Sequence, residues 1–152
     1  MEHQKTHKRG YLATVLGCYC PRCREGKLFR NPLSAKITKN MEMHERCPVC
    51  GQRTEIEVGF YYGTGYASYA LALIFSGVFF FVWWLLIGFS FNDHRFLWWL
   101  FINAIVLVLL QPWVMRVSRS LWISWFVHYN PHWKEHEPNN YERIVEEQMN
   151  NW

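Results

Sequence analysis

YASYALALIFSGVFFFVWWLLIGFSF, residues 66–91, and FLWWLFINAIVLVLLQPWVM, residues 96–115, are two runs without an Asp, Glu, Lys or Arg. As α-helices they would be about 39 Å and about 30 Å long, and the hydrocarbon core of a bilayer is about 30 Å thick. Each run is therefore long enough to cross a membrane. Residues 92–95 between them leave room only for a tight turn. The sequence thus predicts a membrane hairpin of two antiparallel transmembrane helices.

Aromatic residues mark both ends of this predicted hairpin. Tryptophan and tyrosine are enriched at the two membrane–water interfaces, where their rings lie at headgroup level. Four tryptophans gather near the turn and Trp113 lies at the other end with several tyrosines; the four are Trp83, Trp84, Trp98 and Trp99. The pattern indicates two aromatic belts.

Two strongly polar side chains interrupt the second run, Asn103 and Gln111. In an antiparallel pair Asn103 comes close to the level of Ser76, and Gln111 close to that of Ser68. We expect interhelical hydrogen bonds there, each worth about 0.5–1.5 kcal/mol. A transport or proton path is the alternative, but neither run contains the charged groups that mark such a path.

Four of the five cysteines form two C-P-x-C pairs, which predict a metal site held by Cys20, Cys23, Cys47 and Cys50. The proline restricts the backbone, so that a tight turn presents two thiolates together. Zinc is the expected ion, because closed tetrahedral sites of this kind are usually structural, and iron bound as in rubredoxin is the alternative. Unpaired or redox-active thiols, with Cys18 as a spare partner, are a further alternative.

The segment around the cysteines is expected to form a small head of the β-type zinc-ribbon kind. Residues 28–46 leave room for a hairpin between the two pairs, and residues 54–58 alternate polar and apolar as a closing strand does. Gly26 and Gly51 follow the pairs and are expected to take positive φ angles. With so little core of its own, the head should fold only with its metal bound.

The apolar stretch of residues 11–17 is expected to be a strand or half-turn that leads into the first cysteine pair. A lipoprotein signal ending at Cys18 is the alternative. Its apolar run of about six residues is shorter than the roughly 7–15 that secretory signals use. The sequence therefore favours the structural interpretation.

Residues 116–129 are predicted to continue as an amphipathic helix whose aromatic face lies in the membrane interface. A docking face for the head or for a partner helix is the alternative. His128, His132 and His136 recur every four residues and could line a second metal site, but Pro131 opposes a helix through that point. The charged tail, including residues 141–148, is expected to be a terminal helix or partly disordered.

These patterns divide the chain into five parts: a basic N-terminal segment (1–17), a zinc-ribbon-like head (18–58), a transmembrane helical hairpin (59–115), an interfacial amphipathic helix (116–137) and a polar tail (138–152). The first 57 residues contain eleven Lys and Arg against six Asp and Glu. A basic flank beside a membrane favours anionic headgroups and cytoplasmic retention over nucleic-acid binding. Both chain ends are therefore expected on the cytoplasmic side.

Several short motifs carry a resemblance to a known bacterial family: CPRCREGKLF (20–29), CPVCG (47–51), GFYYG (59–63) and the pattern from Gln111-Pro112 to the YNP of 129–131. The chain resembles the domain-of-unknown-function family numbered 983, in particular its Bacteroidetes-type members, over roughly residues 12–131. The resemblance implies a two-span bacterial inner-membrane protein with an N-terminal zinc-ribbon-like head and no established activity. Some relatives are encoded beside cytochrome oxidase assembly genes, which implies a role around respiratory complexes. Cys18 departs from the family pattern.

A non-enzymatic membrane adaptor or assembly factor is the function that these features favour. A closed four-cysteine site leaves no open metal position, and the sequence shows neither a phosphate-binding glycine loop nor a nucleophile with its base. The expected partners are the lipid bilayer and other membrane-complex subunits. The alternative is a redox or metal-handling protein with Cys18 as a relay. An enzyme or transporter using His94 or the later histidines ranks last, because two spans enclose no pathway.

Overall fold

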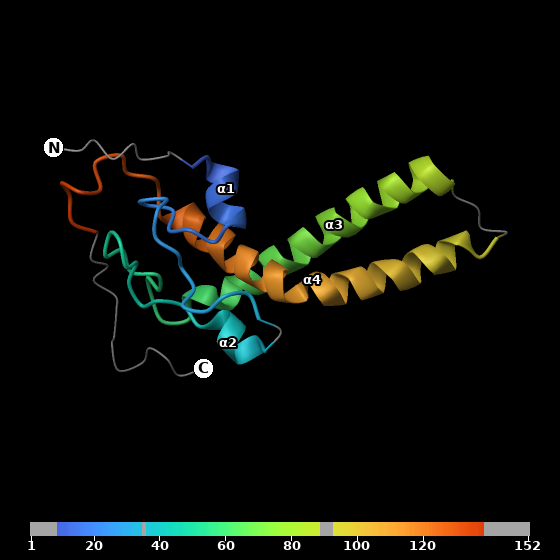
Figure 1. The fold of residues 1–152 in the computed structure, drawn as a ribbon, viewed down its shortest axis with the longest axis horizontal. Coiled ribbons are helices and arrows are strands. Elements are labelled where there is room, and N and C mark those ends of the chain that lie inside the picture. Colours follow the sequence, from blue (N-terminus) through green and yellow to red (C-terminus); the bar gives the residue numbers. More distant parts are fainter. Residues whose placement is uncertain (1–8, 35, 89–92, 139–152) are drawn as a thin grey trace.

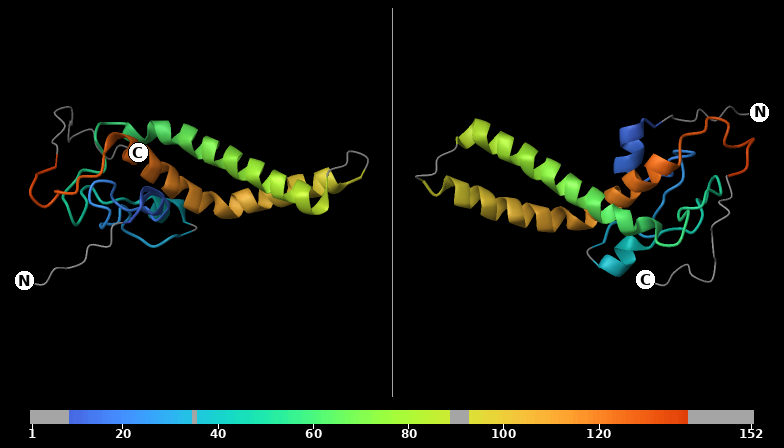
Figure 2. Two further views of the ribbon diagram at one scale, coloured as in Figure 1. Left: turned by 90° about the horizontal axis from the view of Figure 1, so that it is seen from above. Right: turned by 180° about the vertical axis from the view of Figure 1, so that it is seen from behind.

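The computed structural model describes residues 9–34, 36–88 and 93–138, which form a helical hairpin with a small head at one end (Figure 1). In chain order the elements are α1 (Tyr11–Leu16), α2 (Ile37–Met41), the 3-10 helix η1 (Phe60–Gly63), α3 (Thr64–Ile87) and α4 (Arg95–Phe126). The residues before α3, the end of α4 and the segment after it together make the head (Figure 2).

The hairpin consists of two helices long and apolar enough to cross a membrane, Phe60–Ile87 and Arg95–Phe126, as the two uncharged runs predicted. None of the most apolar stretch of the first helix is buried, and only 11% of that of the second. A soluble core helix would instead hide such residues inside the protein. An exposed apolar surface of this extent calls for an apolar surrounding, which a bilayer supplies.

Polar side chains join the two helices. Asn103 donates from Nδ2 to the Oγ of Ser76 at 3.2 Å, which confirms the predicted pair. Ser68 donates to the Oγ of Ser118 at 2.8 Å, so the predicted partnership of Ser68 with Gln111 is wrong. Matching residues by depth assumes straight helices, and α4 is not straight.

α4 continues without interruption to Phe126, well past the predicted end of the span at residue 115. Pro112 therefore lies inside the helix and not near its end. Proline removes the backbone donor that the carbonyl of Val108 would use and bends a helix at that point. α4 changes direction partway along its length (Figures 1 and 2). The helix predicted to continue from residue 116 is found as the last part of α4, but it ends at Phe126, so the helical part of the region 116–137 is shorter than predicted.

The turn between the helices is described only in part, since residues 89–92 lie outside the described residues. Arg95, the first residue of α4, donates from Nη1 to the carbonyl of Ile87, the last residue of α3, at 2.8 Å. This bond ties the two helix ends together. The tail helix expected within residues 141–148 also lies outside the described residues.

The described residues of the head contain no strand, so the predicted β-type ribbon is not found. Three isolated antiparallel bridges connect its loops: Tyr19 with Lys27, Phe29 with Met43 and Arg46 with Arg53. Residues 54–58 do not form a strand; Thr54 bonds the neighbouring loop, its N–H donating to the carbonyl of Glu45 and its hydroxyl to that of His44. The stretch expected to be a strand or half-turn before the first cysteine pair is the helix α1.

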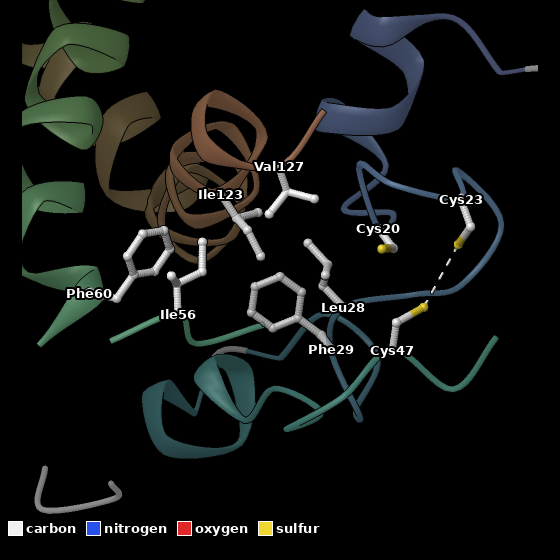
Figure 3. Packing of buried hydrophobic residues seen from close by; sticks show 9 residues of the cluster. All are labelled: Cys20, Cys23, Leu28, Phe29, Cys47, Ile56, Phe60, Ile123 and Val127. Atoms are coloured by element: carbon white, nitrogen blue, oxygen red, sulfur yellow. Dashed lines mark hydrogen bonds between the residues drawn. The ribbon is translucent and has the colours of Figure 1, made fainter. Parts of the chain in front are cut away.

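The core of the head includes the last turn of α4 and the residue after it. Its buried members are Ile123, Val127, Leu28, Phe29, Ile56 and Phe60, together with Cys20, Cys23 and Cys47 (Figure 3). Trp122 donates from Nε1 to the carbonyl of Phe60 at 2.8 Å, and its ring leaves no room for a side chain at Gly63. The end of α4 therefore serves as a docking face for the head, the alternative that the sequence left open.

Candidate metal centre

The two cysteine pairs form turns of the same shape. In the first turn the N–H of Arg24 donates to the carbonyl of Cys20 at 2.8 Å, and in the second the N–H of Gly51 donates to that of Cys47 at 2.9 Å. Each turn is closed across its base, where the N–H of Cys20 donates to the carbonyl of Gly26 and that of Cys47 to Gln52. The repeated geometry brings both thiols of each pair to one side.

The four sulfur atoms that the sequence grouped come together and could hold a metal ion. They all lie within 4.8 Å of one another. Cys20 Sγ lies 3.7 Å from Cys50 Sγ, and Cys23 Sγ lies 3.8 Å from Cys47 Sγ. A tetrahedral ion with metal–sulfur bonds of about 2.3 Å requires sulfur–sulfur separations of about 3.8 Å. These distances fit such an ion and are far too long for a disulfide of about 2.05 Å.

The thiols differ in how readily they lose their protons. Cys20, Cys23 and Cys47 are buried, whereas Cys50 is half-buried. A hydrogen bond with Cys20 is the main cause that lowers the pKa of Cys23, to about 6, and also that of Cys47. The hydrogen bond with Cys23 is the main cause that raises the pKa of Cys20. A divalent cation bound between the four sulfurs would draw all of them into the thiolate form.

Gly26 allows the two turns to approach each other. A Cβ at this position would lie 2.4 Å from Cys47 Sγ, and the N–H of Gly26 donates to Cys23 Sγ at 3.5 Å. Its φ is not positive, contrary to prediction; the left-handed residue of the first turn is Arg24, at φ 60°. Gly51 has the predicted positive angle, φ 69°. Gly26 is thus needed for space and not for its backbone angle.

Arg22, inside the first cysteine turn, is a supporting residue that the sequence did not single out. It is only 5% exposed. Its Nη1 donates to the carbonyl of Cys50 at 3.2 Å and its Nη2 to that of His136, while the N–H of Asn130 donates to the Arg22 carbonyl. Arg22 therefore links both turns to the segment after α4. In the sequence, the only feature that marks Arg22 is its position as a charged residue between Cys20 and Cys23.

Arg116 and Asn40 fix the head to α4, and the sequence did not predict this joint. Arg116 is 7% exposed and donates from Nε to the carbonyl of Asn40 at 2.8 Å and from Nη2 to that of Pro32 at 3.0 Å. Asn40 donates from Nδ2 to the carbonyl of Pro112 at 2.7 Å. The guanidinium of Arg116 also lies over the ring of Phe29. Arg116, the first residue after the second uncharged run, thus contacts protein.

Cys18 lies outside the group of four sulfurs. Burial raises the pKa of its thiol to about 11, so the thiol is protonated at neutral pH. Its backbone takes a left-handed φ of 56°, and its carbonyl accepts a hydrogen bond from the N–H of Leu28. A half-buried, protonated thiol is a poor nucleophile and a poor metal ligand.

The three histidines spaced by four do not share a helix, because α4 ends at Phe126 before the first of them. His132 lies beside the carboxylate of Glu135, with Nδ1 3.5 Å from Oε2. Within residues 9–34, 36–88 and 93–138, the four cysteines form the only group of three or more such residues close enough to hold one metal.

Comparisons of the chain with models of protein families, with curated proteins and with solved structures find no match. Its similarity to the domain-of-unknown-function family 983 therefore stays a prediction from the quoted motifs.

Proposed function

We propose that the protein is a non-enzymatic adaptor or assembly factor of a membrane complex. In this proposal zinc bound by Cys20, Cys23, Cys47 and Cys50 folds a head that the helical hairpin fixes to the membrane surface. The observation that carries the proposal is the shared core, in which the cysteines of the head pack in one cluster with Ile123 of α4. In the proposal, a head that shares its core with a membrane-spanning helix is held in a fixed position at the membrane surface, where a partner protein can bind it.

The proposed role of the ion is structural. Four protein sulfurs complete a tetrahedral shell, so no position is left for a substrate or a reactive water. Leu28, packed in the same cluster, is fully buried. The described part of the head has isolated bridges in place of a β-sheet, so it contains little regular structure. Such a small fold depends on its metal in the way that other small zinc domains do.

We place the head on the cytoplasmic side of a bacterial inner membrane, with both chain ends on that side. The described segments before α3 and after α4 lie at the same end of the hairpin (Figure 1). Arg46 and Arg53 belong to that end, while Arg95 lies beside the turn at the other, and positive residues near spans favour the cytoplasmic side. Metal-bound thiolates also suit a reducing compartment. Membership of family 983 and a respiratory partner are parts of the same proposal.

Elemental analysis of the purified protein, with mass spectrometry of co-purifying proteins, tests the proposal. We expect one zinc per chain, retained in Cys18→Ser and lost in Cys20→Ser and Cys47→Ser. We also expect subunits of a membrane complex to be captured by a photo-crosslinking residue at Val49, which is 43% exposed at the tip of the second turn. A crosslinking residue at Leu86, 79% exposed on the lipid-facing surface of α3, is the matched control. A chain that crosslinks to no protein through Val49 would refute the adaptor role.

A redox protein with iron in the same site is the second candidate. A tetrahedral set of four sulfurs accepts iron as well as zinc, and half-buried Cys50 brings one edge of the site near solvent. Iron would colour the protein and give a reversible reduction potential. A colourless protein with stoichiometric zinc after expression in iron-replete medium excludes this function.

A further inference from the structure

A cavity of about 310 Å³ lies between α1, the first cysteine turn and the end of α4. Thr14 and Arg24 line it from the first two elements, Ser120 and Ser124 from α4, and His128 from the segment that follows. α1 lies beside the end of α4 in both ribbon figures (Figures 1 and 2). The cavity is separate from the four sulfurs, and its volume is at the lower end of the range of small-molecule sites.

Ser120 presents an unpartnered hydroxyl in the wall of this cavity. The residue is 1% exposed, and its Oγ makes no hydrogen bond in the described part of the chain. Three other hydroxyls of the wall have partners: Thr14 donates to the carbonyl of Gly10, and Ser124 shares a hydrogen bond with Tyr11. A buried polar group without a partner is costly. A guest in the cavity would supply the missing bond to Ser120.

The charge of the wall is positive. The Arg24 guanidinium lies 4.2 Å from the ring centroid of Tyr129, and its Nη1 donates to the carbonyl of Arg9 at 2.9 Å. An arginine has five N–H donors, and most of those of Arg24 have no partner within the described residues. Arg24 makes no ion pair within the described residues, and no carboxylate lines the cavity. His128 adds an imidazole to the same wall.

We infer that this cavity binds a phosphate group, with Arg24 as its cation and Ser120 as a hydrogen-bond partner. Guanidinium matches the oxygens of phosphate, and the remaining oxygens of the same group can reach hydroxyl donors. The phosphate belongs either to a soluble phosphate ester or to a lipid headgroup. α1 presents Leu12, 71% exposed, and Leu16, 47% exposed, beside the cavity, so a lipid has an apolar surface along which to approach. The inference does not depend on the adaptor function or on which metal is bound.

The test measures thermal unfolding of the metal-loaded full-length protein in nanodiscs. One arm adds glycerol 3-phosphate to phosphatidylcholine nanodiscs, and the other replaces part of the phosphatidylcholine with phosphatidylglycerol. Ser120→Ala removes the unpartnered hydroxyl with little change of volume, and Arg24→Gln removes the charge. Arg30→Gln is the matched control, because Arg30 is half-exposed and pairs with Glu42 on the surface.

We expect one of the two probes to stabilise the wild type and the Arg30→Gln control. The apparent affinity should fall roughly tenfold or more in Arg24→Gln, as expected for loss of a charge-assisted hydrogen bond. Ser120→Ala should unfold at a higher temperature than the wild type without a probe, yet respond less to it. Stabilisation by glycerol 3-phosphate identifies a soluble ester, and stabilisation by phosphatidylglycerol alone identifies a headgroup. No stabilisation by either probe, or an equal response in Ser120→Ala, overturns the inference.

Discussion

Arg24 and Gly51 occupy the same place in the two cysteine turns. Each is the fourth residue after the first cysteine of its pair, and both have left-handed φ angles, of 60° and 69°. Glycine takes this conformation freely, whereas an L side chain pays about 1–2 kcal/mol for it. In the first turn, contacts of the arginine with Tyr129 and Arg9 offset that cost. The second turn depends on glycine.

Gly51→Ala should therefore destabilise the head by about 1–2 kcal/mol. The distortion is in the turn, so a lower chelator concentration should release the metal. Metal release monitored with a colorimetric zinc indicator measures the effect. Gly10→Ala is the control, since its φ is −64° and a Cβ there meets no atom within 4 Å. Equal behaviour of the two variants would contradict the prediction.

Gly26→Ala should affect the metal site more strongly. Its new Cβ would lie 2.4 Å from Cys47 Sγ, so one turn must move away from the other. We expect metal affinity to fall about 10–100-fold, as it does when supporting contacts of metal ligands are lost. Competition with a chelator of known affinity measures it. A wild-type affinity would show that the turns can separate without changing the site.

Metal removal should unfold the head and leave the hairpin helical. Chelation should expose Leu28 and Phe29, now buried beside the sulfurs, to protease, while most far-UV circular dichroism from α3 and α4 persists. Acid should also release the metal. The pKa of Cys23 is lowered to about 6, so its contribution to metal binding is lost as the pH falls through that value and its sulfur takes up a proton. A protease-resistant head after complete chelation would show that the metal is not structural.

Arg116→Met should loosen the head from α4. The substitution leaves the carbonyls of Asn40 and Pro32 without their donor, at a cost of about 1.5–3 kcal/mol for hydrogen bonds to a charged group. Trypsin should then cut faster after Lys36 and Lys39, next to this joint. Arg30→Met, on the surface of the head, should leave the rate unchanged. Unaltered cleavage in Arg116→Met would rule out Arg116 as the anchor.

Asn103→Ala should weaken the pairing of the two spans only slightly. One amide nitrogen bonds Ser76, but the Asn103 Oδ1 has no partner among the described residues, so we expect a loss of about 0.5–1.5 kcal/mol. A double-mutant cycle with Ser76→Ala, followed by unfolding in a denaturing detergent, isolates the bond. Fully additive effects would mean that the two side chains do not interact.

The sequence predicted what depends on local pattern. Uncharged length identified the two spans, the two C-P-x-C pairs grouped the four sulfurs, and depth matching found Ser76 and Asn103. Each of these signals is a property of one or two segments. They could be recognised without knowing how the head packs.

The parts that failed depend on partners far along the chain. The alternation in residues 54–58 resembles a strand, but no second strand lies beside it. The apolar face predicted within residues 116–129 fits either a bilayer interface or a protein core, because both are apolar; only packing with the head decides. The sequence placed Pro112 near the end of a span, whereas it lies inside the longer helix α4.

The continuity of α4 links the membrane to the head mechanically. A hairpin adapts to bilayer thickness by changing its tilt. Here α4 runs without interruption from its apolar part, past the bend at Pro112, into the core that contains the cysteines, and Arg116 and Asn40 tie the head to it. In the proposed membrane setting, a change of tilt would therefore also reorient the head, and the thickness of the surrounding lipid would affect the direction in which the head points.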